Sequence, residues 1–76
     1  MSTAQELVVA QQGSHQYVLT LDLPGRAVST WTGTLTPGTR DTRHDIYLWL
    51  RDQITTETPA FAQGNVVFFS LEPNHL

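Results

Sequence analysis

Hydrophobic residues follow a period of two over residues 16–23, QYVLTLDL, with Val18, Thr20 and Asp22 on the second face, which is typical of a half-buried β-strand. One face of this strand would carry four apolar side chains: Tyr17, Leu19, Leu21 and Leu23. Pro24 and Gly25 follow directly. Because proline presets φ at the second position of a turn and glycine supplies a positive φ at the third, this pair predicts a type II turn.

A second strand is predicted over residues 28–36, where threonine occupies every second position from Thr30 to Thr36. Trp31 and Leu35 would face the same way as the leucines of the first strand, which leaves the threonines on the opposite face. Two interpretations of this row stay open. It is either a solvated face chosen for the β-propensity of a branched side chain, or a hydroxyl platform that binds a partner.

The apolar period changes from two to 3.6 after Pro37 and Gly38, which predicts an amphipathic helix over residues 42–54. Thr42 followed by Asp45 is an imperfect capping box at its start. One stripe should cover the sheet, formed by Ile46, Tyr47, Leu50 and Ile54, with Trp49 on its flank. Leu48 would point away from this stripe and marks a weak candidate for an interface.

The last predicted element is a strand over residues 65–72, after a proline-containing loop in which Phe61 should pack under the helix. Its continuous apolar run from Val66 to Phe69 is typical of a strand covered on both faces. We expect Val67, Phe69 and Leu71 to face the helix. Val66 and Phe68 would then emerge on the opposite face, next to Val18.

This order predicts one α+β domain over residues 15–76, with a three- to four-stranded mixed sheet and one helix packed on one face. The last strand should lie beside the first, which gives the order 2-1-3. A helix between two strands favours a crossover to a parallel neighbour. Residues 1–14 are interpreted as a flexible N-terminal segment, with an extra strand possible at residues 7–10.

The hairpin, the TPGT strand end, the capped helix, the proline-containing loop and the apolar last strand together resemble a ubiquitin-like β-grasp over residues 16–72. That resemblance implies a β-grasp fold for these residues. The chain ends in EPNHL and not in the diglycine tail by which such modifiers are conjugated, so the resemblance does not extend to conjugation.

Composition removes several classes of protein. With 76 residues and no cysteine, the chain is one domain with a thin core and no disulfide or thiolate metal site. Four arginines, no lysine and seven acidic residues give a net charge of −3, which provides no footprint for nucleic acid. No apolar run is long enough for a membrane span or a secretory signal, so a cytoplasmic protein without membrane contact is expected.

Candidate chemistry is sparse. His15, His44 and His75 have no metal-ligand spacing, and no nucleophile is placed with a base, so we expect no catalytic residue, metal or cofactor. Arg40, Arg43 and His44 sit where the helix begins, and free backbone amides there favour anions. An anion- or nucleic-acid-binding regulator is therefore the alternative function, although nearby aspartates already supply the negative charge.

The sequence favours a non-enzymatic, homodimeric protein–protein interaction module with an accessory or regulatory role. An apolar outer sheet face would have to be covered by a second copy or by residues 7–10. The predicted interaction surface consists of Val18, Thr30, Thr32, Thr34, Leu48, Val66 and Phe68.

Overall fold

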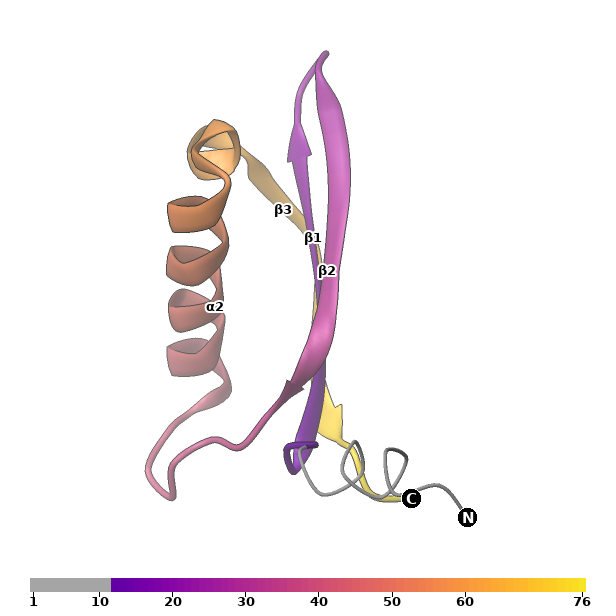
Figure 1. Ribbon diagram of the computed structural model, residues 1–76, viewed down its shortest axis with the longest axis vertical. Coiled ribbons are helices and arrows are strands. Elements are labelled where there is room, and N and C mark those ends of the chain that lie inside the picture. Colours follow the sequence, from indigo (N-terminus) through magenta and orange to yellow (C-terminus); the bar gives the residue numbers. More distant parts are fainter. Residues whose placement is uncertain (1–11) are drawn as a thin grey trace, which may run out of the picture.

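The computed structural model describes residues 12–76, in which strands and helix follow the predicted order (Figure 1). The elements are β1 (His15–Leu23), β2 (Ala27–Leu35), α2 (Arg43–Glu57), the 3₁₀ helix η1 (Pro59–Gln63) and β3 (Asn65–Pro73). Every predicted strand and the helix are present, with ends shifted by three residues or fewer. The prediction of a strand at residues 7–10 lies outside the described residues.

The hairpin is the longest continuous pairing in the fold. β1 and β2 pair antiparallel over all nine residues, from His15 opposite Leu35 to Leu23 opposite Ala27. Gly25 has a φ of 72°, and the Arg26 N–H donates to the Leu23 carbonyl at 2.9 Å. A positive φ at the third position defines the type II turn, so this prediction is confirmed.

The sheet has the order β2-β1-β3, and β3 pairs antiparallel with β1. The order is as expected, but the mixed sheet was wrong, because all described pairings are antiparallel. β3 runs in the same direction as β2, as a crossover through a helix favours. β1 lies between them, so the parallel strand is not a neighbour. Neither the β-grasp arrangement nor a fourth strand is confirmed for residues 12–76.

A bulge in β3 changes which of its side chains face the helix. Phe69 lies opposite Leu19 and Phe68 opposite Thr20, but Val66 lies opposite Leu21, so Val67 is an extra residue. Because a bulge shifts the alternation by one position, Val66 shares the helix-facing side with Leu21. The prediction that Val66 lies on the outer face was therefore wrong. Phe68 lies on the outer face, as expected.

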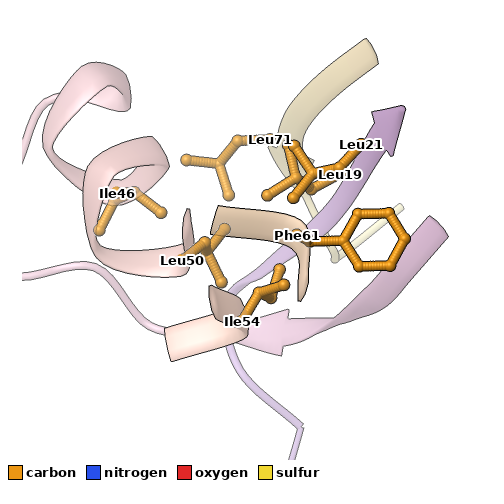
Figure 2. Close-up of a cluster of buried hydrophobic side chains, with 7 residues drawn as sticks. All are labelled: Leu19, Leu21, Ile46, Leu50, Ile54, Phe61 and Leu71. Carbon is orange, nitrogen blue, oxygen red and sulfur yellow. The ribbon is translucent and has the colours of Figure 1, made fainter. Parts of the chain in front are cut away.

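The core lies between α2 and the sheet and takes side chains from β1, β3, α2 and η1 (Figure 2). Its buried members are Leu19, Leu21, Ile46, Leu50, Ile54, Phe61 and Leu71. Phe61 is buried in one cluster with Leu50 and Ile54 of α2, which confirms its predicted place, and its ring packs edge-on against Trp31 with ring centroids 5.2 Å apart. Leu19 and Leu21 are fully buried, and each such side chain stabilises the fold by about 1.5–3 kcal/mol.

The capping box at the start of α2 is confirmed. The Asp45 N–H donates to the Thr42 hydroxyl at 3.1 Å, and the Thr42 N–H donates to the Asp45 carboxylate at 3.0 Å. The Thr42 backbone N–H, and next the Thr42 side chain, lower the pKa of the Asp45 carboxyl below its usual 3.8. The cap fixes the residue at which the chain leaves the loop after β2 and enters the helix.

Candidate interaction surface

β2 is an edge strand without the features that usually protect such an edge. Its sequence, AVSTWTGTL, contains no charged residue and no proline, and its pairing with β1 has no bulge. Among residues 12–76, no strand pairs with its other side. An exposed edge presents a row of N–H and C=O groups to which another strand can bond. β2 is therefore an unprotected edge of the sheet within the described residues.

The second edge strand, β3, is different. It carries the bulge at Val67, an exposed carboxylate at Glu72 and proline at its last residue, Pro73. Bulges, charges and proline each hinder the addition of another strand. The two edges of one sheet are thus unequally protected.

Thr30, Thr32 and Thr34 lie on the outer face of the sheet, away from α2, Thr36 follows the end of β2, and all four residues are exposed. Three of the hydroxyls bond within the domain. Thr30 and Thr20 hydroxyl oxygens lie 2.8 Å apart, Thr34 accepts from the Gly13 N–H at 2.9 Å, and Thr36 accepts from the Ser14 N–H at 3.2 Å. These contacts tie β2 to β1 and to Gly13 and Ser14, which precede β1. They favour a row that belongs to the sheet itself over a hydroxyl platform that binds a partner.

A groove lies on the helix side of β2, and its lining is partly apolar and partly acidic, with Asp41, Asp45 and Glu57 among its residues. Two hollows of about 220 Å³ each share Leu35 and Trp49. The hollow toward the end of α2 is also lined by Tyr17, Trp31 and residues of α2. We call these two hollows, with the Trp49 side chain between them, the Trp49 groove. Trp49 is 53% exposed, a large value for a tryptophan beside a core.

The groove exists because the helix is offset from β2. The buried stripe of α2 meets core side chains of β1, β3 and η1, and no residue of β2 is fully buried. The space above Gly33 is filled by the Tyr17 ring, since a Cβ at Gly33 would lie 2.9 Å from that ring. Trp49 was predicted on the flank of the helical stripe, but its role as the wall of a groove was missed.

The seven predicted surface residues do not form one surface. Five share the outer face of the sheet: Val18, Thr30, Thr32, Thr34 and Phe68. Val66 is turned to the helix side by the bulge. Leu48 is 50% exposed but stands on α2, which covers the opposite face of the sheet. Val28, the most exposed valine of the described chain, was missed and lies on the outer face opposite Asp22.

The three residues of the predicted anion site have different surroundings. Arg43 lines a hollow of about 380 Å³ together with His15 and Asp41. His44 stacks on Tyr47, with ring centroids 6.0 Å apart, and Arg40 lies in the turn closed by the Gly38 N–H and the Asp41 carboxylate. Asp41 and Asp45 are both bonded to backbone amides of this region. The anion site stays a prediction.

Within residues 12–76, no three histidine, aspartate or glutamate side chains cluster closely enough to hold a metal ion. The helices of this part of the chain lack the length and apolar character that crossing a bilayer requires. No protein-family model, curated protein or solved structure matches the chain.

Proposed function

We propose that this chain is a small non-catalytic protein–protein interaction module that acts as a homodimer in an accessory or regulatory role. The observation that supports it is the position of β2, an uncharged, proline-free and unbulged edge beside the Trp49 groove. Strand addition needs hydrogen-bonding groups along an edge and pockets for alternate side chains. Both lie on the same side of this domain.

The two parts of this surface have different tasks. Backbone groups of β2 bond an extended partner segment and give affinity, whereas the groove receives side chains on the helix-facing side of that segment and gives specificity. Trp49 and Trp31 supply large, rigid apolar contact area there, of the kind that dominates protein interfaces. The exposed threonines of β2 lie on the other face and stay solvated.

Solution mass tests this proposal. Light scattering over a concentration series of the full chain is expected to give the mass of two copies, falling toward one copy on dilution. A monomer at every concentration, up to the highest that stays in solution, would contradict the homodimer.

A further inference from the structure

The geometry points to a specific partner for β2: the β2 strand of a second copy, paired antiparallel so that two sheets join into one of six strands. This inference rests on the proposed function and adds the identity and orientation of the bound strand. A two-fold axis creates this pairing directly, because residue i of one copy then contacts residue j of the other and the reverse.

Charge favours β2 over the other surfaces for self-association. Each copy carries a net charge of −3, so two copies repel one another wherever acidic groups meet. β2 has no charged residue over nine positions, whereas the competing edge β3 has Glu72 and its neighbour Pro73. The β2 strands of two copies can thus approach without bringing charged side chains of the strands together, while Asp41, Asp45 and Glu57 line the hollows beside them.

Symmetry places the two grooves opposite each other. An antiparallel β2 pair within one continuous sheet needs an axis perpendicular to the sheet, which leaves both copies of α2 on the same face. Trp49 stands on the β2 side of α2, since it shares hollows with Leu35 and Trp31. The two Trp49 side chains therefore face the axis from opposite sides.

Spacing shows that these side chains fit the gap. α2 packs over β1 and β3, and strands are about 4.8 Å apart, so the two helix axes would be roughly 20 Å apart. Helices in direct contact are about 8–10 Å apart, so a gap of about 10 Å remains. Trp31 is the middle residue of β2, and full overlap brings both copies of it beneath the gap. Two Trp49 and two Trp31 side chains would fill it.

Amide hydrogen exchange of the full chain, resolved by residue along β2, tests the pairing. In an edge strand alternate N–H groups bond to the neighbouring strand and the others point away. We expect every amide of the middle of β2 to be protected at concentrations where light scattering shows a dimer. The outward-pointing set should lose protection on dilution, while the set bonded to β1 keeps it.

Matched substitutions on α2 test the groove. Trp49→Glu should raise the dimer dissociation constant by roughly 30-fold or more, as loss of a central tryptophan does at interfaces. Leu48→Glu is the control, because Leu48 is 50% exposed against 53% for Trp49, adjoins it in sequence and faces away from β2. It should leave the dissociation constant nearly unchanged. Unchanged exchange of the core amides of Leu19 and Leu21 would show that both variants fold.

The outcomes separate this inference from the proposed function. A dimer whose outward β2 amides exchange freely, and which Phe68→Asp dissociates while Trp49→Glu does not, uses the outer sheet face; it overturns the β2 pairing and keeps the homodimer. A monomer with every β2 amide protected places residues 7–10 of the same chain on this edge and overturns both. A monomer in which only every second β2 amide is protected from exchange also overturns both the β2 pairing and the homodimer.

Discussion

The two sides of α2 differ in how completely they are closed. On the β3 side, Tyr47 packs edge-on against Phe69, with ring centroids 5.5 Å apart. The Arg51 guanidinium donates to the Gly64 carbonyl at 2.9 Å. On the β2 side, Trp49 stands between two hollows and remains half exposed. The β3 flank is closed along the middle of α2, with a hollow of about 380 Å³ lined by Ile46, Leu71 and Pro73 at the start of the helix, whereas the β2 flank is open on both sides of Trp49. We call them the sealed flank and the open flank.

This difference shows which flank of α2 is closed by contacts within a single copy. The sealed flank is formed by side chains of α2 and β3 and by the Gly64 carbonyl, so it contributes to the stability of a single copy. The open flank pairs an unprotected strand with unfilled apolar space, which is the arrangement that an added strand would complete. Substitutions on the sealed flank should change folding, and those on the open flank should change association.

The largest expected effect is in the core on the sealed side. Leu71→Ala removes a buried side chain and should lower the free energy of unfolding by about 2–5 kcal/mol. Leu35→Ala, on the open side and half-buried, should cost only about 1–2 kcal/mol. Urea denaturation of both variants, at a concentration where light scattering gives one copy, compares them. Equal losses would contradict the difference between the flanks.

A smaller effect is expected at the polar contact of the sealed side. Arg51→Ala leaves the Gly64 carbonyl without its side-chain donor and should lower the free energy of unfolding by about 1–2 kcal/mol. The loss stays at this level because Nη1 of Arg51 is buried with no hydrogen-bond partner among residues 12–76, a cost that the variant removes.

Gln53→Ala is the matched control for Arg51→Ala. Gln53 is exposed and lines the hollow on the open side of the same helix, two residues further on. Its substitution should change the unfolding free energy by less than about 0.5 kcal/mol. If denaturation curves showed Gln53→Ala to be the more damaging change, the sealed flank would not be the one that stabilises the domain.

Much of the fold was predictable because local patterns decide it. The alternation in residues 16–23, the Pro24–Gly25 turn and the Thr42–Asp45 cap each specify geometry over a few residues, and all three are confirmed. The direction of β3 relative to β1 was not predictable in this way. It depends on which strand β3 pairs with after the connection through α2, and no local sequence pattern specifies that.

The candidate site was only partly predictable for a related reason. A bulge at Val67 moved Val66 to the helix-facing side, and bulges leave little trace in a continuous apolar run. The Trp49 groove arises from the offset of α2 away from β2, which is a property of packing between elements. One signal was present in the sequence: β2 has neither charge nor proline, which is unusual for an edge strand.

The smallest effect concerns the cap that joins the loop after β2 to α2. The folded-state pKa of Asp45 is lowered, chiefly by the Thr42 backbone N–H, so its ionised form is favoured in the folded protein. The resulting stability is present above the unfolded-state pKa and is lost as the pH falls through the lower folded-state pKa. Asp45→Asn should therefore reduce the denaturation midpoint at neutral pH and reduce it less as the solution becomes acidic.

Asp52→Asn is the control, because it removes an exposed charge from the same helix without touching the cap. The difference between its denaturation midpoint and that of the wild type should vary less with pH. Parallel pH profiles of the denaturation midpoint for the wild type and Asp45→Asn would show that the capping contact does not stabilise the start of α2.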